Sequence, residues 1–150
     1  MCSFVVFSSD NLSLSDLSKA LKKVYHRGPD NNYLAIENGL LWGFNRLSIM
    51  DLSSNGNQPF KYDSCELVCN GEIYNYRELM PELIAAGHRF KSHTDSEVLL
   101  HGYEEWGEKL PEKLRGMFAF IIWDRKKKQL FGARDMFGIK PFYYSKMGDT

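Results

Sequence analysis

The chain opens Met1-Cys2-Ser3-Phe4-Val5-Val6-Phe7-Ser8, which places a cysteine immediately before an apolar, β-prone run. Residues 3–8 are typical of a buried strand. Residue two is small, so removal of Met1 would leave the Cys2 thiol beside a free α-amine. An amine with an ordinary pKa of roughly 7.7–8.0 accepts protons near neutral pH, and a thiolate is a strong nucleophile. Cys2 is therefore a candidate self-activated nucleophile, although a cysteine at position two also occurs by chance.

Six short motifs follow this opening along the chain. They are HRGPD (26–30), RLSIMD (46–51), NGEIYN (70–75), TDSEV (94–98), RGMFAF (115–120) and RDMFGIKP (134–141). In this order and with these gaps, the chain resembles the glutaminase domain of the glutamine-hydrolysing asparagine synthetases. These enzymes are class II, N-terminal-nucleophile (Ntn) glutamine amidotransferases. The resemblance covers nearly the whole chain, and the RGPD and RLSI forms favour asparagine synthetase over the related enzyme that makes glucosamine 6-phosphate.

Composition agrees with one small enzyme domain. The 150 residues are 43% hydrophobic and 14% aromatic, as in globular proteins rather than disordered ones. The formal net charge is zero and the basic residues do not gather in one segment, so neither nucleic acid nor a membrane is an expected partner. No apolar run approaches the ~20 residues of a membrane span, and the N-terminus does not resemble a signal peptide. Three cysteines, an odd number, predict a reducing cytoplasm.

The residue pattern predicts short strands mixed with helices. Residues 12–25 predict an amphipathic helix that starts near Ser13 and Asp16. Residues 33–36 and 40–47 predict a hairpin around Glu37-Asn38-Gly39, and residues 66–70 predict another strand. Residues 75–86 predict a helix ending at Gly87, in which Pro81 predicts either a kink or a late start.

The second half predicts one more helix and three more strands. Asp95 is expected to cap a helix that reaches Trp106. Residues 117–123 and 129–133 predict paired strands around a charged, solvated turn at 124–128, and residues 142–145 predict a last strand. An aromatic set is expected mainly in the core, although part of it could face a partner domain: Phe118, Phe120, Trp123, Phe131, Phe137, Phe142 and Tyr143.

Strands and helices that follow one another without regular alternation predict an α+β fold. The resemblance implies a specific form of it, an Ntn-hydrolase-type four-layer sandwich with two stacked antiparallel sheets flanked by helices. It also implies a single glutaminase domain over residues 1–150. That domain is expected to be incomplete at its C-terminal end, with a synthetase domain beyond Thr150.

The resemblance assigns the catalytic roles. Cys2 would attack the glutamine carboxamide and form a thioester, and water would then hydrolyse it. Asn70 and Gly71 match the oxyanion hole of the family, although an isolated Asn-Gly pair is more often a tight turn. His26 is expected to be structural. Cys65 and Cys69 share one face of a strand and lack the second ligand pair of a zinc site, so both are expected to be core or edge thiols.

The same resemblance assigns a clamp on the amino-acid head group. Arg46 matches the group that binds the α-carboxylate, and a planar guanidinium suits that role, although a lone Arg is more often a surface residue. Glu72 and Asp95 match the acidic residues that hold the α-ammonium. Backbone groups near Ile49 and Met50 would line the same pocket.

The expected partners are glutamine and the synthetase domain, with a homodimer also open. No cofactor or metal is expected in this domain, and ATP and magnesium would belong to the synthetase part. Aspartate is the default ammonia acceptor, although other amidotransferases share this glutaminase half. Two alternatives remain open: an Ntn amidase for another linear amide, and a catalytically inactive docking or regulatory domain. Ser3 and Phe4, where the family usually has Gly-Ile, keep the inactive alternative open. Phe44, where the family commonly has His, is a further departure from the pattern.

Overall fold

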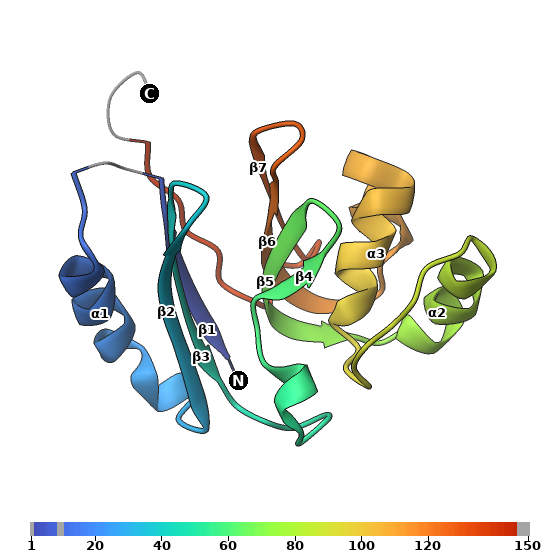
Figure 1. Cartoon of the computed structure of the whole chain (residues 1–150). Coiled ribbons are helices and arrows are strands. Elements are labelled where there is room, and N and C mark those ends of the chain that lie inside the picture. The colour runs from blue at the N-terminus through green and yellow to red at the C-terminus, as the bar shows by residue number, and fades with distance from the viewer. Residues whose placement is uncertain (1, 9–10, 147–150) are drawn as a thin grey trace.

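Two antiparallel sheets lie face to face, with helices on the outer face of each (Figure 1). A computed structural model describes residues 2–8 and 11–146, so Met1 and Thr150 lie outside the described residues. The first sheet has the strand order β1-β3-β2 and the second has the order β4-β5-β6-β7. Helix α1 covers the first sheet and α3 covers the second, while α2 packs beside α3. The predicted four-layer α+β sandwich is confirmed.

The elements have the following bounds. The strands are β1 (Ser3–Phe7), β2 (Asn31–Glu37), β3 (Leu40–Arg46), β4 (Phe60–Tyr62), β5 (Cys65–Ile73), β6 (Gly116–Asp124) and β7 (Gln129–Arg134). The α-helices are α1 (Leu14–Lys23), α2 (Tyr76–Ala85), α3 (Glu97–Trp106) and α4 (Leu110–Lys113). Short 3-10 turns are η1 (Tyr25–Arg27), η2 (Ser54–Gly56) and η3 (Gly107–Lys109).

Strand β3 is buried on both faces, which explains why residues 40–44 are apolar without alternation. Trp42 and Phe44 face the second sheet and form the inter-sheet core with Val68 of β5. Successive residues of a strand point to opposite sides, so Gly43 faces α1. A Cβ there would lie 2.6 Å from Leu21, so the glycine lets the helix pack directly on the strand.

The local predictions for the first half are largely confirmed. Ser13 caps α1 through a reciprocal capping box with Asp16. Asn38 and Gly39 have φ values of 54° and 78°, which are the left-handed conformations that a two-residue hairpin turn needs. Pro81 lies inside α2, which begins at Tyr76, so the predicted late start is wrong. Tertiary packing of Leu79 and Leu83 into the core outweighs the missing proline N–H.

Two predictions about the C-terminal residues are wrong. Residues 142–145 form no strand, and Tyr143 and Tyr144 are 92% and 88% exposed. Their aromatic composition suits a strand, but a strand also requires a hydrogen-bonded neighbour, and the described residues offer none here. Phe137 and Tyr143, expected mainly in the core, are instead exposed. Phe118 and Phe120 are in the core as predicted.

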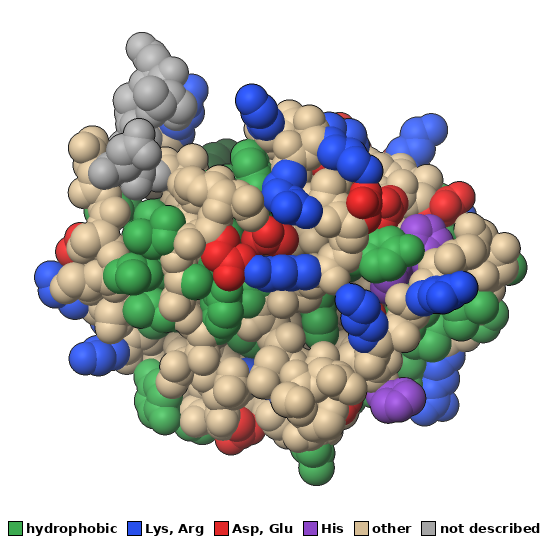
Figure 2. Space-filling model, in the orientation of Figure 1, with side chains coloured by type: hydrophobic (Ala, Val, Ile, Leu, Met, Phe, Trp, Pro, Cys, Tyr) green, Lys and Arg blue, Asp and Glu red, His purple; other side chains and the backbone are tan. Residues whose placement is uncertain are grey.

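Charge is spread over the surface. Figure 2 shows Lys and Arg side chains across the whole visible face, with Asp and Glu between them. Several are paired, including Lys61 with Glu37 and Lys126 with Asp63, which confirms a solvated turn after β6. Among the described residues, no helix has the length and apolar character needed to cross a bilayer.

Candidate active site

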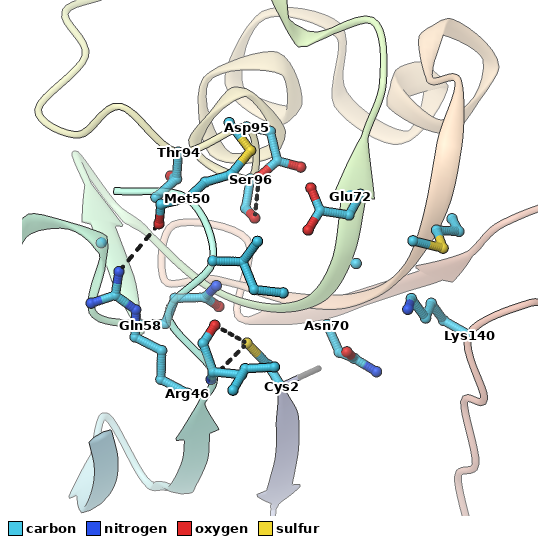
Figure 3. Close-up of a pocket in the computed structure, with 15 residues that line it drawn as sticks. Cys2, Arg46, Met50, Gln58, Asn70, Glu72, Thr94, Asp95, Ser96 and Lys140 are labelled. Atoms are coloured by element: carbon cyan, nitrogen blue, oxygen red, sulfur yellow. Dashed lines mark hydrogen bonds between the residues drawn. The ribbon is translucent and has the colours of Figure 1, made fainter. Parts of the chain in front are cut away.

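A cavity of about 110 Å³ opens where the ends of strands from both sheets meet. It is lined by Cys2 before β1, Arg46 at the end of β3, the segment 47–58, the end of β5, the turn 94–96 and Lys140 (Figure 3). All eight predicted site residues line this one cavity: Cys2, Arg46, Ile49, Met50, Asn70, Gly71, Glu72 and Asp95. The fold therefore brings together residues up to 138 positions apart in the chain, from Cys2 to Lys140.

The Cys2 thiol is held by the backbone of Leu47. Its Sγ donates to Leu47 O at 3.8 Å and accepts from Leu47 N at 3.5 Å. Burial raises the pKa of Cys2 above its ordinary value, although the Leu47 N–H opposes that shift. An isolated thiol here would stay protonated at neutral pH, so catalysis requires a base that removes its proton.

The residues that depart from the family pattern do not crowd the thiol. Ser3 points away from the cavity, because its Oγ donates to Val24 O at 3.3 Å and accepts from Asn45 Nδ2 at 3.2 Å. Phe4 packs in the inter-sheet core and lies 6.2 Å from the ring of Phe142. Phe44 is completely buried in the same core. These observations remove the steric reason for expecting an inactive site.

Asn70 and Gly71 lie inside β5, so their interpretation as a tight turn is wrong. In the amide orientation that satisfies its neighbours, Asn70 Nδ2 donates to Cys2 O at 3.0 Å and its oxygen accepts from Arg27 at 3.3 Å. Arg27 Nε also donates to Cys2 O at 3.3 Å. A Cβ at residue 71 would lie 2.4 Å from Met117 O, so β6 approaches too closely for any other residue.

Arg46 is 5% exposed and directs its guanidinium toward the 47–58 segment. It donates to Ser53 O at 2.8 Å and to Asn57 Oδ1 at 2.7 Å, and it also donates to Asp51 O. These bonds hold the segment that carries Ile49 and Met50 against the cavity. Arg46 therefore has a structural role in addition to any contact with a ligand.

Asp95 is not the predicted helix cap. Ser96 occupies the cap position of α3, whereas the Asp95 carboxylate accepts from the backbone N–H of Ile73 at the end of β5. An Asp before a helix usually caps it, but here a buried N–H on the neighbouring strand competes successfully for the carboxylate. Figure 3 shows Asp95 and Glu72 together on the side of the cavity opposite Cys2.

Both carboxyl groups are harder to ionise than usual. Burial is the main reason that the pKa of Asp95 is raised, and burial followed by the charge of Asp95 raises the pKa of Glu72. The nearby Lys140 ammonium opposes the shift of Glu72. Two adjacent carboxylates in a partly desolvated site favour a cationic ligand group between them.

Sequence reasoning missed several lining residues. Lys140, which is 3% exposed, enters the cavity because Asp135 accepts from the backbone N–H groups of Lys140 and Ile139 at 3.0 and 2.9 Å. Lys140 belongs to the 134–141 motif, for which the sequence had predicted no role in the site. Gln58 and Thr94 also line the cavity. Gln58 lay outside the motifs, and its amide oxygen accepts from Cys69 N at 2.6 Å.

The remaining side chains that the sequence singled out lie outside the cavity. His26 is exposed and does not line the cavity. Cys65 and Cys69 are 4% and 1% exposed and pack in the core beneath α3. No group of three or more His, Cys, Asp or Glu is arranged to hold a metal ion within the described part of the chain.

Comparisons with known proteins agree with this site. The family model of the glutamine amidotransferase domain matches residues 1–150. Asparagine synthetase [glutamine-hydrolyzing] 1 of Bacillus subtilis is 45% identical over 157 aligned positions, covering 99% of this chain and 25% of that protein. Asparagine synthetase [glutamine-hydrolyzing] 3 of the same organism is 44% identical, covering 83% of this chain and 21% of that protein. The chain thus spans about a quarter of the length of these relatives.

A more distant protein in the same comparison is Amidase chry2 of Gibberella zeae, which is 38% identical over 88% of this chain and 20% of its own length. Among solved structures, the glutamine phosphoribosylpyrophosphate amidotransferase of B. subtilis superposes with a TM-score of 0.69. It covers 99% of this chain and 40% of its own length, and its 20% identity shows the shared fold alone. The family match over the whole length and the 45% identity together show that this chain belongs to the glutamine amidotransferase domain family, as the glutaminase-type domain found in glutamine-hydrolysing asparagine synthetases.

Proposed function

We propose that this chain hydrolyses the side-chain amide of glutamine to glutamate and ammonia. One observation carries the proposal: the Cys2 thiol shares a cavity with Arg46, Glu72 and Asp95. One cation and two carboxylates suit the head group of a free α-amino acid, while the thiol suits attack on its amide. The B. subtilis relatives are named for glutamine hydrolysis, which supports the same substrate here.

The first half of the reaction follows from Cys2 and its neighbours. The α-amine of Cys2, freed by removal of Met1, takes the thiol proton, and the thiolate attacks the carboxamide carbon. The negative charge that develops on the amide oxygen is stabilised by Asn70 Nδ2 and the Gly71 N–H, which lie beside the nucleophile. The protonated amine then donates its proton to the leaving nitrogen, so ammonia departs and a thioester remains.

The second half returns the enzyme to its starting state. The neutral amine accepts a proton from water as the water attacks the thioester, and the same donors stabilise the second tetrahedral intermediate. Collapse of that intermediate releases glutamate and restores the Cys2 thiol. Throughout, Arg46 would hold the α-carboxylate, and Glu72 with Asp95 would hold the α-ammonium.

Ammonia release has a use when a second reaction consumes the product. Because the relatives are asparagine synthetases about four times as long as this chain, we include in the proposal an ATP-dependent, amide-forming partner domain that needs magnesium. Aspartate is the proposed acceptor. A cytoplasmic location and a homodimer also belong to the proposal; the three free thiols fit a reducing compartment.

The similarity to Amidase chry2 favours one second candidate, an amidase for another linear amide. The decisive experiment is an ammonia-release assay on purified protein whose first residue is Cys2. Glutamine should be hydrolysed, whereas an amide without the amino-acid head group, such as butanamide, should react far more slowly. Equal rates on both amides would favour the second candidate, and no reaction with either would favour an inactive docking domain.

A further inference from the structure

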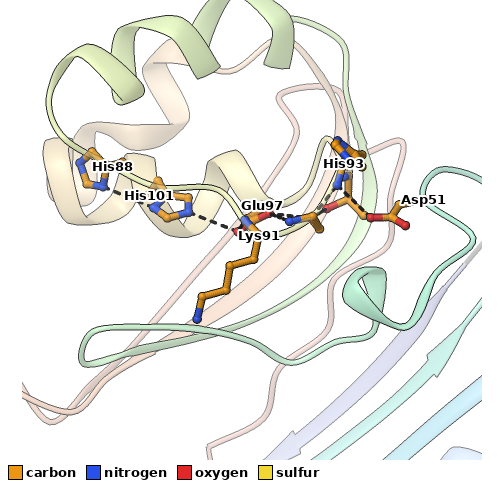
Figure 4. Close-up of polar contacts among 8 residues, drawn as sticks. Asp51, His88, Lys91, His93, Glu97 and His101 are labelled. Carbon is orange, nitrogen blue, oxygen red and sulfur yellow. Dashed lines mark hydrogen bonds and ion pairs between the residues drawn. The ribbon is translucent and has the colours of Figure 1, made fainter.

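Glu97 is the first residue of α3 and is only 4% exposed, yet it does not line the cavity. Its carboxylate turns back over the segment that precedes the helix (Figure 4). Oε1 accepts from Lys91 N at 2.8 Å, and Oε2 accepts from Ser92 N at 2.7 Å and from Ser92 Oγ at 2.6 Å. A single buried side chain thus binds three donors of one short turn.

A histidine closes the remaining side of this carboxylate. His101, one helical turn further along α3, is fully buried between the rings of Tyr62 and Phe90, each with its centroid 4.3 Å away. Its Nε2 lies 3.4 Å from Glu97 Oε1. Burial alone would raise the pKa of Glu97, but hydrogen bonds from His101, Ser92 and the backbone lower it below its ordinary value. The carboxylate is therefore an ionised, almost completely buried acceptor.

The turn held by Glu97 leads directly into the cavity. Ser92 Oγ accepts from Thr94 N at 3.2 Å and lies 2.8 Å from Thr94 Oγ1. Thr94 and the following Asp95 both line the cavity. On the other side of the turn, His93 N donates to Asp51 Oδ2 at 2.8 Å. This bond joins the turn to the 47–58 segment. Glu97 thus anchors the turn from behind, and Asp51 anchors it from the side.

We propose that Glu97 is a positioning residue for the ammonium end of the glutamine site, because its carboxylate sets the 91–94 turn and hence the direction in which Asp95 enters the cavity. The proposal rests on the proposed function and adds a residue that contacts neither the thiol nor the cavity. It predicts an effect on glutamine binding through Asp95, with the chemistry at Cys2 left intact.

The role requires a carboxylate rather than any polar side chain. Lys91 N, Ser92 N and Ser92 Oγ all donate to Glu97, and an ionised carboxylate is an acceptor at both oxygens. In Glu97→Gln, the amide NH₂ would face an N–H or O–H donor, so at least one buried donor would lose its partner. The side chain has nearly the same shape, so packing around α3 is preserved.

The test compares Glu97→Gln with Glu105→Gln. Glu105 lies about 12 Å further along the same helix and contacts His88 Nε2 at 3.3 Å. It therefore joins the far end of the polar chain that runs through His88 and His101 to Glu97, but it does not contact the 91–94 turn. In Glu97→Gln, KM for glutamine should rise by about tenfold or more while kcat stays within about threefold. The Glu105→Gln variant should keep both constants within about twofold.

Two further readouts separate positioning from a general loss of structure. Alkylation of Cys2 by iodoacetamide, which has no amino-acid head group, should proceed at the wild-type rate in Glu97→Gln. Alkylation by an electrophilic glutamine analogue with an intact head group should slow in parallel with the rise in KM. Hydrogen exchange at the Lys91 and Ser92 amides should be faster in Glu97→Gln than in Glu105→Gln, whatever the activity of the protein.

The outcomes are distinguishable. If the wild-type chain does not hydrolyse glutamine, the proposed function fails and the hydrogen-exchange result still tests whether Glu97 holds the turn. Suppose that the wild-type chain is active. An unchanged KM for glutamine in Glu97→Gln would then show that the positioning role is wrong. Equal losses of kcat and of the iodoacetamide alkylation rate in that variant would show the same. Should Glu97→Gln not fold, Ser92→Ala removes only the Ser92 hydroxyl, and an unchanged KM in that variant would also overturn the proposal.

Discussion

The Asp95 carboxylate accepts a hydrogen bond from the backbone N–H of Ile73, which joins the turn before α3 to the end of β5. This bond places Asp95 next to Glu72, the neighbour of Ile73 in the strand. The two acids of the cavity are thereby held together by main-chain geometry, although 23 positions separate them in the chain. A substitution can therefore remove the charge of Asp95 and still leave this bond in place.

Asp95→Asn should weaken glutamine binding by about 2–5 kcal/mol, because the amide can still accept from Ile73 but no longer attracts an ammonium group. Steady-state kinetics with glutamine and with glutaramate, which lacks the α-amine, provides the measurement. The Asp95→Asn variant should lose far less affinity for glutaramate than for glutamine. Equal losses on both substrates would show that Asp95 is structural only.

Arg46→Ala should lower kcat/KM by more than about tenfold on glutamine, and also measurably on 4-aminobutanamide, which lacks the carboxylate. The second effect is expected because the guanidinium also holds the carbonyl groups of Asp51 and Ser53. Hydrolysis assays on both amides, with proteolysis of the 47–58 segment as a structural readout, would check this. A loss confined to glutamine would show that the loop does not depend on Arg46.

Cys2→Ala should abolish glutamine hydrolysis and leave the thermal unfolding temperature nearly unchanged, because only the attacking atom is lost. Cys65→Ser should retain turnover within about fivefold, since burial raises the pKa of Cys65 to about 11 and this thiol is a poor nucleophile at neutral pH. Ammonia release and circular dichroism provide the measurements. Loss of activity in a folded Cys65→Ser protein would contradict the assignment of the nucleophile.

Protein that retains Met1 should be inactive, because the base is then an amide nitrogen rather than an amine. Removal of Met1 by an aminopeptidase should restore turnover, and intact-mass analysis would verify the state of each sample. The pH dependence of kcat/KM in the processed form should show a rising limb from an amine that must be deprotonated. Comparable turnover by both forms would rule out the self-activated mechanism.

Glu72→Gln should raise the unfolding temperature at pH 7 while lowering affinity for glutamine. The folded-state pKa of Glu72 is raised from an ordinary value of 4.5, so the folded protein holds this proton more tightly than the unfolded chain. Protonated Glu72 therefore stabilises the folded protein. This stabilisation is complete when the pH is below the ordinary pKa of Glu72, and it is lost as the pH rises through the folded-state pKa.

Calorimetry at pH 4 and pH 7 measures this effect. The stability difference between Glu72→Gln and wild type should be larger at pH 7, where the wild-type carboxylate is ionised next to Asp95. Saturating glutamine should reduce the difference by stabilising wild type. A variant that is less stable than wild type at pH 7 would show that Lys140 more than offsets the cost of burying the Glu72 charge.

Much of this protein could be predicted from residue patterns. The capping box at Ser13, the Asn38-Gly39 turn and the apolar strand after Cys2 are local features, because propensity and hydrogen bonds over a few residues determine them. The site residues were predicted by a different route, the resemblance carried by six motifs. That resemblance named eight residues, all of which line one cavity.

Long-range packing accounts for what the pattern could not predict. Asp95 leaves the helix cap because Ile73 N, 22 positions away, needs an acceptor, and residues 142–145 remain without a strand partner among the described residues. Lys140 reaches the cavity because Asp135 anchors its backbone, and Glu97 contributes from behind the turn without touching the cavity. Each outcome depends on which buried donor meets which acceptor, and that pairing exists only once distant segments have packed together.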